Sequence, residues 1–115
     1  MIPLAIFAQK KAKDLSLKNR LKLYKTEDMN TMLELDTRTG VVKQIHWALK
    51  SDEEKVYTIN PNDLSESAES GPNVFELYAT NNMYQFILIN KVNGNKWHIQ
   101  WGEDKDHRWI RKIKQ

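Results

Sequence analysis

A segment of 29 residues occurs twice in this chain, and the repeat limits the folds that the chain can adopt. Residues 19–47, NRLKLYKTEDMNTMLELDTRTGVVKQIHW, return as residues 73–101, NVFELYATNNMYQFILINKVNGNKWHIQW, at a constant offset of 54 and without a gap. A repeat of this length is typical of one supersecondary unit that has been copied. Eight of the 29 aligned positions are identical: Asn19/Asn73, Leu23/Leu77, Tyr24/Tyr78, Thr26/Thr80, Met29/Met83, Gly40/Gly94, Ile45/Ile99 and Trp47/Trp101.

Each copy has the pattern of four short strands. Leu21 and Leu23 alternate with polar or amphipathic residues, as in a half-buried strand. Further strands are expected over residues 31–36, 41–49 and 55–60, with counterparts in the second copy that end with residues 108–113. We therefore predict an all-β fold of two four-stranded antiparallel meanders, which form one sandwich, a closed barrel or a two-blade unit. At 115 residues the chain suits a single domain over 19–115, made of a repeat at 19–60, a linker at 61–72 and a repeat at 73–114.

The middle of each repeat predicts a β-hairpin. Gly40 in T-R-T-G and Gly94 in K-V-N-G stand where a type I turn needs a residue of positive φ. A turn of this kind is expected to pair Leu33 with Ile45 and Ile87 with Ile99. One face of each sheet then becomes the core, with Trp47 and Trp101 as core residues in preference to ligand platforms, and Tyr24 and Tyr78 as further structural positions of the repeat. The predicted core is Leu21, Leu23, Leu33, Leu35, Ile45, Trp47 and their counterparts in the second copy.

The opposite face carries the candidate binding residues. Q-I-H-W in the first copy corresponds to H-I-Q-W in the second, so an amide and an imidazole recur there in reversed order. Apolar residues beside such polar groups can form a small ligand-binding patch. The alternative, which the pattern favours, is a solvated face whose apolar residues are covered by the leader or by a second subunit. The candidate ligand-binding residues are His98, Gln100, Phe86, Leu88, Gln44 and His46.

Composition and charge argue against several functional classes. The chain has no cysteine, and no set of histidines and carboxylates has metal-ligand spacing. No phosphate-binding loop, dinucleotide fingerprint or hydrolase motif is present, so we expect no catalytic residue, no cofactor and no metal. The net charge of +3 lies in residues 1–18, which hold four lysines and one aspartate, and residues 19–115 are neutral. A nucleic-acid surface needs basic residues on the folded body, so the charge distribution argues against nucleic acid as a partner.

The leader, residues 1–18, begins with an apolar run that is too short to span a membrane. The run IPLAIFA resembles the end of a secretory signal, which would imply export to the periplasm, the cell surface or the medium. It is equally consistent with a segment that packs on the body of the protein.

The repeat also resembles a known pattern. Residues 23–47 are similar to tandem repeats of small gut-bacterial proteins, whose form is close to L-Y-P-T-x-N-M-W followed by L-D-T-R-T-G-x-x-W-Q-V-Q-W. The second copy matches at Asn82-Met83, Phe86 and Trp97 to Trp101, whereas Lys25 and Ala79 replace the proline and Asn30 and Tyr84 replace the first tryptophan. The L-D-T-x-T-G element is also similar to the hairpin of propeller blades. The resemblance brings no catalytic residue and no ligand.

These observations predict a non-enzymatic binding or interaction module for a protein or carbohydrate ligand. The alternative is a structural protein whose repeats mediate self-association, as a homo-oligomer.

Overall fold

The computed structural model describes residues 19–66 and 71–114, and these residues form an all-β fold. The leader and residues 67–70 of the linker lie outside the described residues. Two single turns of 3-10 helix, η1 (Ser51–Glu53) and η2 (Lys105–His107), precede the last strand of each repeat. The eight strands are β1 (Leu21–Lys25), β2 (Thr31–Asp36), β3 (Val42–His46), β4 (Lys55–Asn60), β5 (Phe75–Ala79), β6 (Gln85–Asn90), β7 (Lys96–Gln100) and β8 (Trp109–Ile113).

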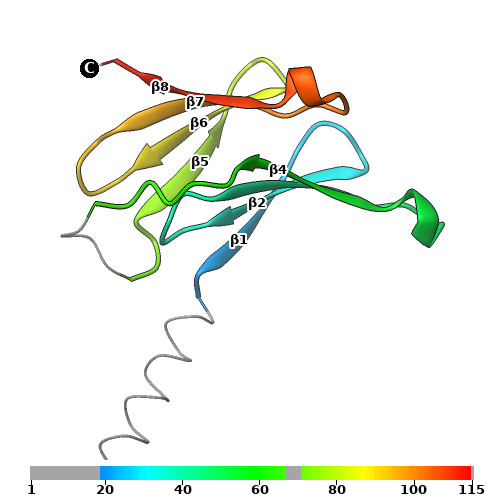
Figure 1. Ribbon diagram of the computed structural model, residues 1–115, viewed down its shortest axis with the longest axis horizontal. Coiled ribbons are helices and arrows are strands. Elements are labelled where there is room, and N and C mark those ends of the chain that lie inside the picture. Colours follow the sequence, from blue (N-terminus) through cyan, green and yellow to red (C-terminus); the bar gives the residue numbers. More distant parts are fainter. Residues whose placement is uncertain (1–18, 67–70, 115) are drawn as a thin grey trace, which may run out of the picture.

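The strands form two separate antiparallel meanders, which confirms the predicted fold class. Sheet A has the order β1-β2-β3-β4 and sheet B the order β5-β6-β7-β8, so the fold is not a closed barrel. Sheet A, in blue to green, lies below sheet B, in yellow-green to red, in Figure 1. The sheets pack together, with β2 against β5 and β4 against β8.

The predicted hairpin turns are present in both copies. Gly40 and Gly94 have φ angles of 82° and 80°, a region that only glycine adopts at little cost. The Asp36 carbonyl accepts from Gly40 N at 2.9 Å, and the Asn90 carbonyl accepts from Gly94 N at 2.8 Å. The side chains of Asp36 and Asn90 accept further bonds from the amides of the turns. The local turn chemistry is therefore the same in the two repeats.

The predicted strand register is wrong by one residue in both hairpins. Leu33 pairs with Gln44 instead of Ile45, and Ile87 pairs with His98 instead of Ile99. The cause is the length of the turn. Asp36 N donates to Val41 O at 2.9 Å, so the strands close around the four residues 37–40. A shift of one residue moves every side chain of a strand to the other face.

The burial of individual residues shows that the two sheets bury non-equivalent faces of the repeat. Sheet A buries Leu33 and Leu35 in β2, whereas sheet B buries Phe86 and Leu88 in β6, which stand at the opposite parity of the repeat. The prediction that Leu21, Leu23 and Trp47 belong to the core is therefore wrong, since their exposed fractions are 58%, 54% and 40%. The buried hydrophobic core is Leu33, Leu35, Val42, Ile59, Val74, Phe75, Leu77, Phe86, Leu88, Trp97, Ile99 and Trp101.

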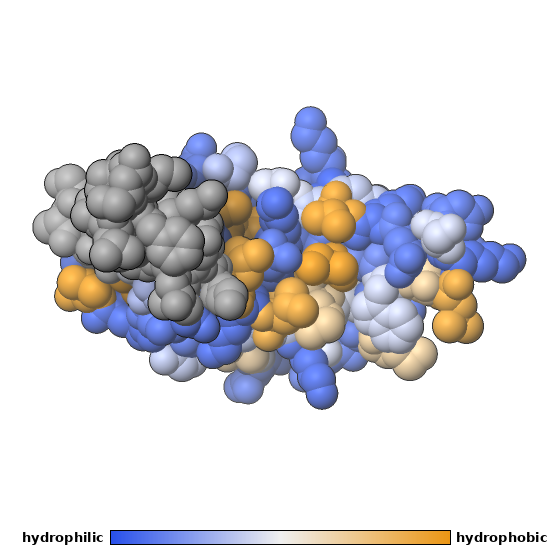
Figure 2. Space-filling view, turned by 90° about the horizontal axis from the view of Figure 1, so that it is seen from below, coloured by the Kyte–Doolittle hydropathy of each residue, from blue (hydrophilic) through white to orange (hydrophobic). Residues whose placement is uncertain are grey.

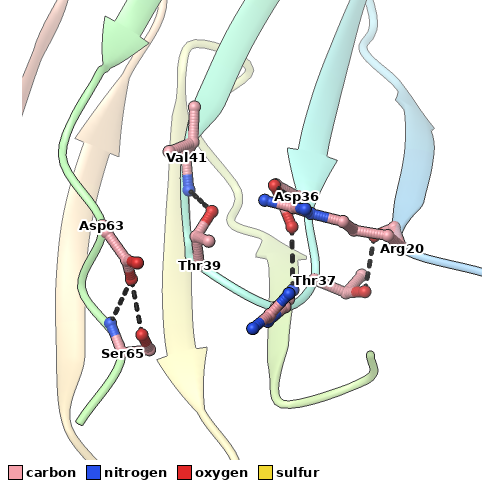
Figure 3. A network of polar contacts seen from close by, with 8 residues as sticks. Arg20, Asp36, Thr37, Thr39, Val41, Asp63 and Ser65 are labelled. Atoms are coloured by element: carbon pink, nitrogen blue, oxygen red, sulfur yellow. Dashed lines mark hydrogen bonds and ion pairs between the residues drawn. The ribbon is translucent and has the colours of Figure 1, made fainter. Parts of the chain in front are cut away.

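The turn of the first hairpin binds both the linker and the start of the second repeat. Thr39 O accepts from Leu64 N at 2.7 Å, and Thr37 O accepts from Val74 N at 3.0 Å and from Phe75 N at 2.8 Å. Polar contacts fix the turn itself: Arg20 Nε lies 2.6 Å from Asp36 Oδ2, and the Thr37 hydroxyl donates to Arg20 O (Figure 3). This turn therefore connects sheet A to the first strand of sheet B.

Candidate binding surface

A groove of about 550 Å³ opens at one end of sheet B. The turn before β6 forms one wall, and the loop between β7 and β8 forms another. The residues along it combine an aromatic pair with three carboxylates and two amides. They are Asp28, Asn82, Met83, Tyr84, Gln100, Trp101, Gly102, Glu103, Asp104 and His107.

The aromatic pair consists of Tyr84 and Trp101. Their ring centroids are 4.8 Å apart, and the ring planes are inclined by 49°. Trp101 Nε1 donates to Met83 O at 2.9 Å, and Trp101 N donates to Tyr84 O at the same distance. Trp101 is 3% exposed and Tyr84 is 45% exposed. Trp101 is therefore a fixed support, and Tyr84 is the ring that a ligand can reach.

Gln100 connects the wall of the groove to the loop after β7. Its Oε1 accepts from Gln85 Nε2 at 3.0 Å, and its Nε2 donates to His107 O at 3.0 Å. Arg108 also holds this loop, because its Nη1 donates to Gly102 O at 3.0 Å and to Glu103 O at 2.7 Å. The groove thus has its shape before any ligand enters.

A second groove of about 420 Å³ lies beside the first and shares Glu103 and Asp104 with it. Sheet A supplies most of its walls, including Gln44 and His46. His46 Nδ1 lies 3.4 Å from the Thr31 hydroxyl. This groove is more polar than the first, and its other residues are Asp52, Glu53, Lys55 and Tyr57.

The six predicted binding residues do not form one patch. Phe86 and Leu88 belong to the core, and Gln44 is buried, with its Oε1 accepting from Gly102 N at 3.1 Å. Gln100 lines the first groove, and His46 lines the second. The patch was predicted from a register in which Phe86 faced Gln100 and Leu88 faced His98. In the structure, Phe86 pairs with Ile99 and Leu88 with Trp97.

His98 lies on the outer face of sheet B, away from both grooves. Its ring meets Trp109 edge-on with centroids 4.8 Å apart, and its Nδ1 lies 3.3 Å from Arg111 Nη2. Partial burial lowers the pKa of His98 below its ordinary value, and the positive charge of Arg111 lowers it further. His98 is therefore a neutral group near pH 7.

The sequence reasoning missed Tyr84 and the loop residues that complete the first groove. Tyr84 carried a usable signal, since it replaces the first tryptophan of the resembling repeats. The loop over residues 102–107 has no such signal in the sequence, because its position depends on the bonds from Gln100 and Arg108.

The described part of the chain contains no group of three or more histidine or acidic side chains placed to hold a metal ion. Within the same residues, no helix has the length and apolar character needed to cross a membrane.

Comparisons with known proteins give no relative of this chain. No protein-family model matches it, and no curated protein or solved structure matches it significantly.

Proposed function

We propose that this protein is a non-enzymatic binding module whose ligand lies in the first groove, against the ring of Tyr84. The observation that carries the proposal is an accessible aromatic ring held on a buried one, with carboxylates beside it. Aromatic rings offer flat apolar surface, and a few polar groups in a concave site fix the orientation of a ligand. A carbohydrate suits this combination, because a sugar has an apolar ring face and hydroxyl groups that donate to carboxylates.

The fixed shape of the groove supports the same proposal. The bonds from Trp101 Nε1, Gln100 Nε2 and Arg108 Nη1 hold its walls in place. Binding to a preformed site loses little conformational entropy, so modest contacts are enough for affinity.

The experiment is an NMR titration with soluble oligosaccharides: maltotriose, cellotriose and chitotriose. One of them should shift the resonances of Tyr84, Gln100 and Trp101. Tyr84→Ala should weaken binding of that sugar by about tenfold or more, which corresponds to about 1.4 kcal/mol. Tyr78→Ala is the matched control, because Tyr78 is an exposed tyrosine of the same sheet outside the groove. Equal affinity of Tyr84→Ala and the wild type, or no shift with any of these sugars, would contradict the proposal.

A second candidate function is self-association through the repeats. It is favoured by large apolar side chains that stand exposed on sheet A, namely Leu21, Leu23 and Val56. Contiguous exposed apolar surface usually marks an interface.

A further inference from the structure

Each sheet has one face in the interior and one outer face. The residues on the outer face of one sheet occupy the same positions of the repeat as the residues on the inner face of the other sheet. Sheet A turns one face of the repeat inward, and sheet B turns the other face inward. The outer face of sheet A therefore corresponds, position by position, to the inner face of sheet B. The outer face of sheet B corresponds to the inner face of sheet A.

The outer face of sheet A keeps the apolar character of its buried counterpart. Leu23 corresponds to Leu77, which is 3% exposed, and Val56 corresponds to Ile110, which packs against the core. Figure 2 views the protein from below, the side on which sheet A lies in Figure 1, and hydrophobic residues gather in the middle of this view. The corresponding pairs, with the outer residue first, are Leu21/Phe75, Leu23/Leu77, Met32/Phe86, Ile45/Ile99, Trp47/Trp101 and Val56/Ile110.

The outer face of sheet B matches the inner face of sheet A in the same way. Ile87 and Ile89 correspond to the fully buried Leu33 and Leu35. Tyr78, which is 55% exposed, corresponds to Tyr24, which packs against the core. Ile113 likewise stands where sheet A has the buried Ile59.

The contact between the sheets also contains a charge pair that can repeat. Lys22 Nζ of β1 lies 2.7 Å from Glu76 Oε1 of β5. Position 76 is the equivalent of position 22 in the second repeat. In a contact that repeats the internal one, Glu76 of one copy therefore meets Lys22 of the next, and the two charges are again opposite.

We infer that copies of this chain associate head to tail, with the outer face of sheet A of one copy against the outer face of sheet B of the next. The arrangement repeats the contact between sheets A and B within one chain. The occupant of each outer face is thus a second copy of this protein. The inference rests on the second candidate function, self-association, and is independent of ligand binding in the groove. A head-to-tail contact of this kind is heterologous, so it leads to a ring or a filament instead of a symmetric dimer.

Charged substitutions make this contact weaker than the internal one. Glu34 and Lys43 stand on the outer face of sheet A where sheet B has Leu88 and Trp97. The two are cross-strand neighbours of opposite charge. Their desolvation opposes docking, so the association should be reversible and depend on protein concentration.

The test uses two full-length variants that each block one face. Leu23→Glu places a charge on the outer face of sheet A, and Tyr78→Glu places one on the outer face of sheet B. Both residues are more than half exposed, so the fold should persist, which circular dichroism checks. Sedimentation and native mass spectrometry should show assemblies larger than a dimer for the wild type and monomers for each variant alone. An equimolar mixture of the two variants should form a heterodimer and nothing larger, because each supplies the face that the other lacks.

Several results would overturn the inference. One is a wild type that remains monomeric at all concentrations. Another is a variant that dimerises by itself, because that dimer would indicate a symmetric contact. A third outcome is a monomeric wild type that associates when Leu4 and Ile6 are both changed to Asp. That result would mean that the leader covers the outer face. Sugar binding at Tyr84 is measured on the same samples, so failure of the association and failure of the groove proposal are separate results.

Discussion

The Tyr24 hydroxyl of β1 donates a hydrogen bond to Glu76 Oε1 of β5 and, by this contact, joins the two sheets. The same hydroxyl accepts from Leu77 N at 3.3 Å, on the free edge of sheet B. Burial raises the pKa of Tyr24 to about 12, and the bond to Glu76 contributes to the rise. Desolvation by itself would raise the pKa of Glu76, but the bonds from Lys22 and Tyr24 together outweigh it and lower this pKa.

This pair predicts a loss of stability at both ends of the pH scale. The folded pKa of Glu76 is below its ordinary value of 4.5, so its contribution is present above pH 4.5 and is lost as the pH falls through the folded pKa. The folded pKa of Tyr24 is raised, so its contribution is complete below pH 10 and is lost as the pH rises through about 12.

Urea unfolding over a pH series measures both effects. Glu76→Gln should lower the free energy of unfolding at pH 7 by about 1 kcal/mol and flatten the acid limb. Tyr24→Phe should flatten the alkaline limb and also weaken the acid limb, because it removes one of the two bonds that lower the pKa of Glu76. Curves that stay parallel to the wild type would assign the pH dependence to other groups.

Alanine at the two hairpin glycines should have unequal effects. Both residues have a left-handed backbone, so each substitution costs about 1–2 kcal/mol in strain. A Cβ at Gly40 would lie 3.1 Å from the Phe75 ring and 3.2 Å from Leu64, whereas a Cβ at Gly94 would have open space. Gly40→Ala should therefore destabilise the protein by about 1–3 kcal/mol more than Gly94→Ala. Equal midpoints in chemical denaturation would mean that Phe75 moves aside at no cost.

Local chemistry explains why the strands and turns could be predicted from the sequence. The positive φ of Gly40 and Gly94 and the acceptors at Asp36 and Asn90 act within a few residues of each turn. The turn length was harder to predict. A loop of four residues and a loop of five residues differ only in which backbone groups pair at its ends, and here Asp36 N pairs with Val41 O.

The buried face was predicted correctly for β2, β5 and β7 but not for β1, β3 and β6, for two physical reasons. The run Phe86-Ile87-Leu88-Ile89 is apolar at every position, so it has no period of two that would indicate a face. Equivalent positions of the two copies were also expected to have equivalent burial. Head-to-tail packing of the sheets removes that equivalence, and Leu23 and Leu77 differ in burial although both are leucine.

These two leucines provide a direct test of the packing. Leu77→Ala removes buried apolar volume and should lower the free energy of unfolding by about 2–5 kcal/mol. Leu23→Ala changes an exposed side chain and should cost less than about 0.5 kcal/mol when the protein is dilute enough to be monomeric. Similar losses for the two variants would mean that the outer face of sheet A is covered within the monomer.

The candidate site could be predicted only where the role of a side chain depends on residues close to it in the sequence. Gln100 and His46 were selected as a recurring polar pair, and each lines a groove. His98 was selected by the same pattern and stands on the outer face of sheet B, opposite the core, but neither groove extends to it. The role of Gln44 depends on Gly102, a residue 58 positions away, and no local pattern indicates such a bond.

Gln44 predicts a local change that can be followed at one amide. Its buried Oε1 accepts from Gly102 N at 3.1 Å, and Gly102 is itself buried at the base of the loop after β7. Gln44→Leu leaves this N–H without a partner, which should cost about 1–3 kcal/mol. Hydrogen exchange at Gly102, followed by NMR, should become roughly tenfold faster for each 1.4 kcal/mol lost. Gln85→Leu is the control, since Gln85 donates to a side chain, Gln100, and not to a buried backbone group. Unchanged exchange at Gly102 in Gln44→Leu would show that water replaces the amide oxygen.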